Sequence, residues 1–180
     1  ARMGGCTLPV VINSGSGNQG MTVSLPVIEY AKELHIPEEK LYRALLVSNL
    51  LSIYQKHYIG SLSAFCGAVT AACGSGAALT YMCGGNYEAI CRTITNTLAN
   101  VGGIVCDGAK SSCAAKIASA VDAAITAHQM SMAGHVFQPG EGIVAADPEN
   151  TVKNMGYVGR VGMEKTDIEI LQLMIGNVSA

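Results

Sequence analysis

Charged residues are scarce in this sequence. Asp, Glu, Lys and Arg make up 13% of its 180 residues, about half of the share that is usual in soluble domains. The formal net charge is −2 and no basic cluster occurs, which argues against nucleic acid as a partner. The chain also lacks tryptophan and has only 5% aromatic residues, which argues against base stacking. The scarcity of charge indicates a large buried volume, or a surface covered by a partner such as another copy of the chain.

Long runs of large apolar residues are missing as well. Residues 58–87 contain no charge, which raises the alternative of a membrane span. Gly, Ala, Ser, Thr and Cys dominate this run, whereas membrane-spanning helices depend on Leu, Ile, Phe and Val. We therefore expect a helix buried in a protein core and no membrane partner.

Apolar residues recur at helical spacing along the chain, which predicts an all-α, mainly helical fold. The expected helices cover residues 21–34, 38–57, 62–82, 87–101 and 114–132. A loop that could include a strand is expected over 134–148, then a short helix from 147, and a helix or terminal strand over 163–173. The length suits one domain, so we expect a single globular domain over residues 1–180, whose helices pack through small residues. The abrupt start at Ala1 leads us to expect a piece of a longer protein.

The apolar pattern also predicts which helix faces are buried. The buried face expected for residues 38–57 is made of larger side chains: Leu41, Leu45, Leu46, Leu50 and Ile53. On residues 114–132, His128 lies on an alanine-rich face. It is expected to be a core or interface histidine with its hydrogen bonds satisfied.

The chain has seven cysteines, an odd number, and no secretory segment opens it. Both facts argue against a disulfide framework, so we expect free thiols in a reducing, cytoplasmic compartment. Cys73, Cys83 and Cys91 lie within helical patterns and are expected to be packed core thiols. A structural role is also favoured for Cys6, beside a glycine-rich loop.

Cys106 and Cys113 lie seven residues apart, around an Asp107-Gly108 pair that is typical of a turn. A helix start and the nearby Lys110 are expected to lower the pKa of these thiols, and thiolate is the form that binds metals. The C-x-x-C spacing of common zinc and ferredoxin sites is absent. Spacing alone leaves two alternatives open, metal ligands and packed core thiols.

A polar, glycine-rich segment precedes the first expected helix. Its glycines allow backbone N–H groups to converge on an anion, and the following helix start adds its dipole. The Lys-Ser/Thr ending of a phosphate-binding loop is missing, so a flexible turn remains an alternative. The candidate substrate-binding residues are Asn13, Ser14, Gly15, Ser16, Gly17, Asn18 and Gln19.

Three segments together resemble the serine dehydratase α-chain-like half of the L-cysteine desulfidase family. They are GGCTLPVVINSGSGNQG, SLSAFCGAVTAACGSGAA and NVGGIVCDGAKSSCAAKI, and the resemblance spans nearly the whole chain. It implies a 4Fe-4S cluster held by Cys66, Cys106 and Cys113, with one iron open to the substrate. It also implies that the 13–19 segment binds the substrate carboxylate, and that L-cysteine is converted to pyruvate, ammonia and hydrogen sulfide.

Iron-sulfur L-serine dehydratases share this layout, which leaves L-serine as an alternative substrate. In those enzymes the later cysteine pair is more widely spaced, and at least some carry a further cysteine at the C-terminus. This chain ends Gly-Asn-Val-Ser-Ala, so both departures favour the desulfidase branch. The desulfidases are expected to use a catalytic cysteine near the N-terminus of the complete protein, and Cys6 lies in the wrong motif. The catalytic base is therefore unknown, and a missing N-terminal domain is the expected partner. A second alternative is a helical assembly module without enzymatic activity.

Overall fold

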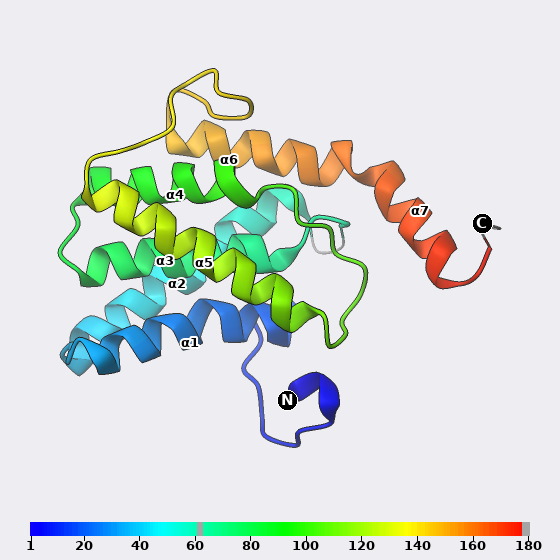
Figure 1. Cartoon of the computed structure of the whole chain (residues 1–180), viewed down its shortest axis with the longest axis horizontal. Coiled ribbons are helices and arrows are strands. Elements are labelled where there is room, and N and C mark those ends of the chain that lie inside the picture. Colours follow the sequence, from blue (N-terminus) through cyan, green and yellow to red (C-terminus); the bar gives the residue numbers. More distant parts are fainter. Residues whose placement is uncertain (61–62, 178–180) are drawn as a thin grey trace.

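The protein is a bundle of α-helices, seen here in a computed structural model that describes residues 1–60 and 63–177 (Figure 1). The helices are α1 (Gly17–Glu33), α2 (Glu38–Ile59), α3 (Gly67–Met82), α4 (Tyr87–Val101), α5 (Cys113–Met132), α6 (Pro148–Tyr157) and α7 (Glu164–Met174). A short 3-10 helix, η1 (Arg2–Gly4), opens the chain, and a π-helical segment, η2 (Val158–Gly162), links α6 to α7. The predicted all-α fold of one packed domain is confirmed.

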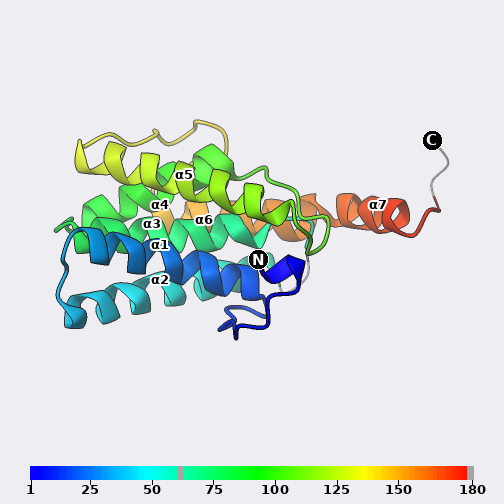
Figure 2. The same cartoon turned by 60° about the horizontal axis from the view of Figure 1, so that its bottom comes forward.

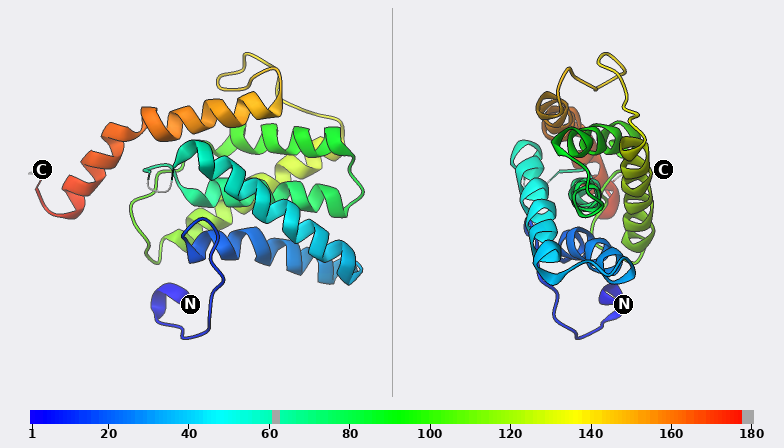
Figure 3. Two further views of the ribbon diagram at one scale, coloured as in Figure 1. Left: turned by 180° about the vertical axis from the view of Figure 1, so that it is seen from behind. Right: turned by 90° about the vertical axis from the view of Figure 1, so that its left-hand side faces the viewer.

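Helix α3 lies at the centre of the bundle, surrounded by α1, α2, α4 and α5 (Figure 3, right). Small residues make this arrangement possible, because neighbouring backbones can approach closely only where no side chain intervenes. A Cβ atom at Gly74 would lie 2.4 Å from the carbonyl oxygen of Ser48 in α2. At Gly76 it would lie 3.0 Å from the Cβ of Ala124 in α5. The uncharged segment thus forms the buried core helix that the sequence predicted.

Local capping residues set the starts of several helices. The N-cap side chains of Ser16, Asn86 and Asp147 accept hydrogen bonds from the first turns of α1, α4 and α6. Because Ser16 caps α1, this helix begins at Gly17, four residues before the predicted start at 21. Pro26 consequently lies inside the helix.

The prediction of the buried face of α2 is wrong for three of its five residues. Leu46, Leu50 and Ile53 are 61%, 62% and 50% exposed. Apart from Ile59 near its end, the buried residues of α2 are smaller or polar: Ala44, Ser48, Ser52, Gln55 and Lys56. The physical reason is the close approach of α2 to α3, which leaves room for serine and alanine but not for leucine between the two backbones.

One further helix start differs from the prediction, and two segments whose type was left open are now assigned. Helix α3 begins at Gly67 rather than 62, and residues 61–62 lie outside the described part of the chain. No strand occurs over 134–148, which forms turns and loop. The segment 163–173 is helical, as α7. None of the helices in the described ranges combines the length and apolarity that crossing a membrane requires.

Helix α7 extends away from the bundle (Figures 1 and 2) and has no buried residue. Its apolar side chains are exposed, and Ile168, Leu171 and Met174 are each more than half accessible. The rest of the helices form the compact body in which the candidate site lies.

Candidate functional site

Three helices, α1, α3 and α5, begin at the same end of the bundle (Figure 2). Their first residues surround a pocket of about 220 Å³. It is lined by Ser14, Gly15, Ser16, Asn18, Gln19, Lys56, Ser63, Phe65, Cys66, Gly67, Ala68, Cys106, Gly108, Ala109, Cys113, Lys116 and Ile117. Helix N-termini present unpaired N–H groups and a positive dipole end. Among the described residues, the lining includes two lysines but no acidic side chain. The pocket therefore favours anionic groups.

The polar segment before α1 forms a tight turn at one wall of this pocket. Asn13 and Ser16 exchange backbone hydrogen bonds of 3.2 and 3.0 Å. The two residues between them have positive φ angles, 50° for Ser14 and 81° for Gly15, as in a type I′ turn. Five of the seven predicted binding residues line the pocket. The exceptions are Asn13, whose amide donates to the Asn49 side chain in α2 (3.0 Å), and Gly17, which lies against Arg2.

Gln19 is the most buried of the five that line the pocket, with only 7% of its surface exposed. Its side chain packs over Gly67, where a Cβ atom would lie 2.4 Å from the Gln19 Nε2. The Oε1 atom is buried and has no hydrogen-bond partner within residues 1–60 and 63–177. An unpartnered buried acceptor reduces stability, and because Gln19 lines the pocket, this atom is available to a ligand.

A short antiparallel pairing of backbones brings two of the predicted ligands together. Phe65 pairs with Val105 as an isolated β-bridge. The N–H of Cys66 donates to Ile104 (3.0 Å) and the N–H of Cys106 donates to Ala64 (2.6 Å). In such a pairing, Cys66 and Cys106 are diagonal neighbours on one face. The two cysteines are 40 positions apart in the sequence, and the bridge makes them adjacent.

The two thiols differ in acidity. A hydrogen bond from the Cys66 thiol, the backbone N–H of Gly108 and the charge of Lys116 together outweigh burial and lower the pKa of Cys106 to about 6. The pKa of Cys66 is raised, first by its hydrogen bond to Cys106 and then by burial. Cys106 is therefore the sulfur that ionises first, and thiolate is the ligating form of cysteine.

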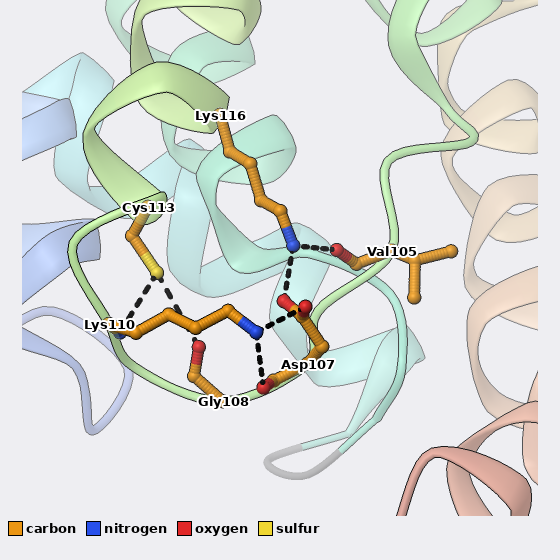
Figure 4. A network of polar contacts seen from close by, with 6 residues as sticks. All are labelled: Val105, Asp107, Gly108, Lys110, Cys113 and Lys116. Carbon is orange, nitrogen blue, oxygen red and sulfur yellow. Dashed lines mark hydrogen bonds and ion pairs between the residues drawn. The ribbon is translucent and has the colours of Figure 1, made fainter. Parts of the chain in front are cut away.

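Cys113, at the start of α5, lines the same pocket, but its sulfur faces the preceding turn (Figure 4). Its Sγ accepts from the N–H of Lys110 (3.4 Å) and lies 3.5 Å from the Gly108 carbonyl. The turn expected at Asp107-Gly108 is present, with Gly108 at φ +91°. Within residues 1–60 and 63–177, no three His, Cys, Asp or Glu side chains stand close enough together to hold a metal ion.

The predicted role of Lys110 differs from what the contacts show. Its ammonium pairs with Asp107 rather than with a thiol, and only its backbone N–H reaches Cys113. Asp107 also pairs with Lys116, and these two lysines, Lys110 first, lower the pKa of the Asp107 carboxyl to about 2. Lys116, which also donates to the Val105 carbonyl (2.8 Å), lowers the pKa of both Cys66 and Cys106 through its charge.

The donor set suits an iron-sulfur cluster in its chemistry. Cys66, Cys106 and Cys113 are all free and line one pocket next to positive helix ends and Lys116. Soft thiolate donors are the ligands of such clusters. Two sulfurs are already neighbours, and the third needs to turn from the Gly108 carbonyl toward the pocket.

One pocket residue, Lys56, was not among the site residues predicted from the sequence. His57 is exposed, whereas Lys56 is 8% exposed and lines the pocket. Burial lowers the pKa of Lys56, and the nearby Cys106 and Cys66 partly oppose this shift. A sequence signal existed: Lys56 continues the four-residue spacing of Ala44, Ser48 and Ser52 along the buried face of α2.

The remaining cysteines lie elsewhere, and all seven are free thiols. Cys73 is fully buried in the core, as predicted. Cys83 is exposed and Cys91 only half-buried, so the prediction of packed core thiols is wrong for these two, which lie at or near helix ends. Cys6 is exposed near the N-terminus.

Comparison with known proteins identifies one family. The family model described as serine dehydratase alpha chain matches residues 1–172. Among curated proteins, a UPF0597 protein of Desulfitobacterium hafniense is 61% identical over 180 residues, which are all of this chain and 42% of that relative. UPF0597 proteins of Lachnoclostridium phytofermentans and Treponema denticola are 61% and 59% identical over 175 residues, 97% of this chain and 42% and 41% of those relatives. No solved structure matches the chain.

Proposed function

Because the chain belongs to the serine dehydratase alpha chain family, we propose that it is the cluster-binding part of an iron-sulfur-dependent amino-acid lyase, an L-cysteine desulfidase. One observation carries the proposal: the 14–19 segment and the three cysteines line a single pocket. An anion-binding turn next to a set of soft metal ligands is the arrangement that an amino acid needs, if its carboxylate is held while its leaving group meets a metal.

The proposed reaction is a β-elimination. A base removes the α-proton of L-cysteine, the Cβ–S bond breaks, and hydrogen sulfide and aminoacrylate form. Aminoacrylate tautomerises to the imine, which reacts with one water to give pyruvate and ammonia. A 4Fe-4S cluster held by Cys66, Cys106 and Cys113 would supply a Lewis acid for the leaving thiolate. The residues of this chain orient the substrate: Ser14, Gly15, Ser16 and Asn18, which line the pocket, bind its carboxylate, and the three helix starts stabilise negative charge.

The catalytic base and the complete active site are part of the same proposal. The chain spans 42% of the length of the curated relatives reported first above, so those proteins have room for a further domain. We place the base in such a domain, as the partner of this one. The seven free thiols suit a reducing, cytoplasmic setting.

The first test is the iron and acid-labile sulfide content of protein purified without oxygen. The wild type is expected to be brown and to contain about four irons per chain if the full cluster forms. Cys106→Ser should lose the cluster, because its sulfur is the most readily ionised of the adjacent pair. Cys83→Ser is the matched control, since this exposed cysteine lies outside the pocket, and it should keep its iron. A full cluster in Cys106→Ser would overturn the ligand assignment.

L-Serine remains the alternative substrate, because a hydroxyl can leave in place of the thiolate. The discriminating measurement compares sulfide released from L-cysteine with pyruvate formed from L-serine, in the same anaerobic preparation. A desulfidase releases sulfide and pyruvate in equal amounts from L-cysteine and turns over L-serine more slowly. A preference for L-serine would assign the chain to the dehydratase branch instead.

The exposed leucines of α2 favour a second candidate, a helical assembly module. Leu46, Leu50 and Ile53 form an apolar stripe at helical spacing, and such surfaces often mediate association. This candidate predicts a stable oligomer that contains no iron and does not respond to L-cysteine. Analytical ultracentrifugation together with iron analysis distinguishes it from the lyase.

A further inference from the structure

Lys56 places a positive charge inside the pocket without an acidic partner. It lies in the last turn of α2 and is 8% exposed. The pocket lining contains no aspartate or glutamate, and within the described ranges Lys56 forms no ion pair or side-chain hydrogen bond. A buried ammonium is costly unless a counter-charge accompanies it. The charge of Lys56 is therefore available to an anionic ligand.

The second lysine of the pocket, Lys116, differs from Lys56 because it has an acidic partner. Its ammonium binds the Asp107 carboxylate and donates to the Val105 carbonyl (Figure 4). These contacts fix Lys116 to the turn that carries Cys106, next to its own counter-ion. Of the two lysines, Lys56 is the one that pairs with no carboxylate in the described part of the chain, and only the nearby Cys106 and Cys66 thiols favour its charged form.

A matching acceptor, the Gln19 side chain, lines the same pocket. Gln19 is more than nine-tenths buried, lines the same pocket and has an Oε1 atom without a hydrogen-bond partner in the described part of the chain. Its amide packs on Gly67 at the start of α3. An amide oxygen accepts from an ammonium group, so Gln19 complements the positive end of a zwitterion as Lys56 complements the negative end.

We propose that Lys56 and Gln19 form an α-amino-acid subsite, in which Lys56 binds the carboxylate and the Gln19 Oε1 accepts a hydrogen bond from the α-ammonium group. The subsite deepens the proposed function, on which its amino-acid ligand rests. The backbone N–H groups at the start of α1 supply further donors for the carboxylate. Both residues act as positioning groups that orient the substrate toward the three sulfurs.

The test uses three ligands that cannot undergo elimination, with the full chain and isothermal titration calorimetry. L-Alanine has both charges, L-alaninamide lacks the carboxylate, and propionate lacks the ammonium group. The wild type is expected to bind L-alanine at least about tenfold more tightly than either analogue, the range for hydrogen bonds to charged groups. Equal affinities for L-alanine and L-alaninamide, or no binding of L-alanine, would overturn the subsite.

Variants then assign each contact to its residue. Lys56→Met should weaken L-alanine binding about tenfold and leave L-alaninamide unchanged, whereas Gln19→Met should weaken L-alanine and leave propionate unchanged. Lys165→Met, which removes an exposed lysine in α7, is the charge-matched control and should change nothing. If Lys56→Met weakens all three ligands equally, the lysine supports the pocket rather than the carboxylate, and the assignment fails.

The binding test is independent of the cluster and of turnover. If protein without iron still discriminates the three ligands through Lys56 and Gln19, the subsite holds and the lyase proposal alone fails. If the cluster forms but L-alanine and L-alaninamide bind equally, the subsite fails and the lyase proposal stands.

Discussion

Buried polar groups near the two ends of α3 differ in whether they have hydrogen-bond partners. Near its last turn, Thr80 Oγ1 lies 2.7 Å from the Thr93 hydroxyl, 2.9 Å from His128 Nδ1 and 3.1 Å from the Gly76 carbonyl. At its start, about 20 Å away along the helix axis, the Gln19 Oε1 is buried without a hydrogen-bond partner in the described ranges. Lys56, which is 8% exposed, forms no ion pair with a described carboxylate.

This difference separates polar groups that pair with one another in the core from those that lack such partners at the candidate site. A satisfied buried network contributes to stability, whereas a buried polar group without a partner lowers it. His128, although titratable and buried, belongs to the first kind, because it is hydrogen-bonded to Thr80. This confirms its prediction as a core histidine with its hydrogen bonds satisfied. Lys56 and Gln19 belong to the second.

Among the substitutions that test this difference, Thr80→Val is expected to have the largest effect on stability. The substitution keeps the shape of the side chain but removes the hydroxyl that connects Thr93 and His128. It should lower the free energy of unfolding by about 1–3 kcal/mol, the cost of leaving buried partners unpaired. Urea unfolding measures this change. An unchanged midpoint would show that the network contributes nothing to stability.

A smaller change in stability is expected when the pH is lowered. Burial lowers the pKa of His128 below its ordinary 6.5, so the unfolded chain binds a proton more readily than the folded one. The contribution of His128 to stability is therefore complete above pH 6.5 and falls as the pH decreases toward the folded pKa. The difference in unfolding free energy between pH 8 and pH 5.5 should shrink in His128→Gln. His57→Gln, which alters an exposed histidine, should leave the wild-type dependence intact.

The smallest effect on stability is expected for Gln19→Met, the counterpart of Thr80→Val at the pocket end. It also replaces a buried polar group by an apolar one of similar shape, but the Oε1 atom that it removes has no partner in the described chain. The free energy of unfolding should stay within about 0.5 kcal/mol of the wild type or rise, because an unpaired acceptor is no longer buried. A loss of unfolding free energy as large as that of Thr80→Val would show that the polar groups at the two ends of α3 do not differ in this way.

Much of the fold could be predicted from the sequence. The helical class, the central small-residue helix and the approximate ranges of the main helices all follow from local spacing and turn residues. The buried face of α2 could not be predicted in the same way, because hydrophobicity alone favours Leu46 and Leu50 over Ser48 and Ser52. The burial of the serines depends on how closely α3 approaches, which its glycines allow.

The candidate site was predicted in its parts but not in its arrangement. The resemblance supplied Cys66, Cys106 and Cys113, and local composition supplied the 13–19 segment, but nothing in the sequence places them around one pocket. The β-bridge between Phe65 and Val105 does so for two of the cysteines. Such long-range pairing leaves no periodic signal in either segment, so it could not be foreseen.

The sequence by itself determined the helices, their caps and the residue types available for chemistry, because these depend on neighbours within a few positions. Only the tertiary structure decided that α1, α3 and α5 begin at one end, and that Lys56 faces the pocket while Lys116 pairs with Asp107. The physical reason is that burial and charge pairing depend on which helices pack together. That packing is set by contacts between residues far apart in the chain.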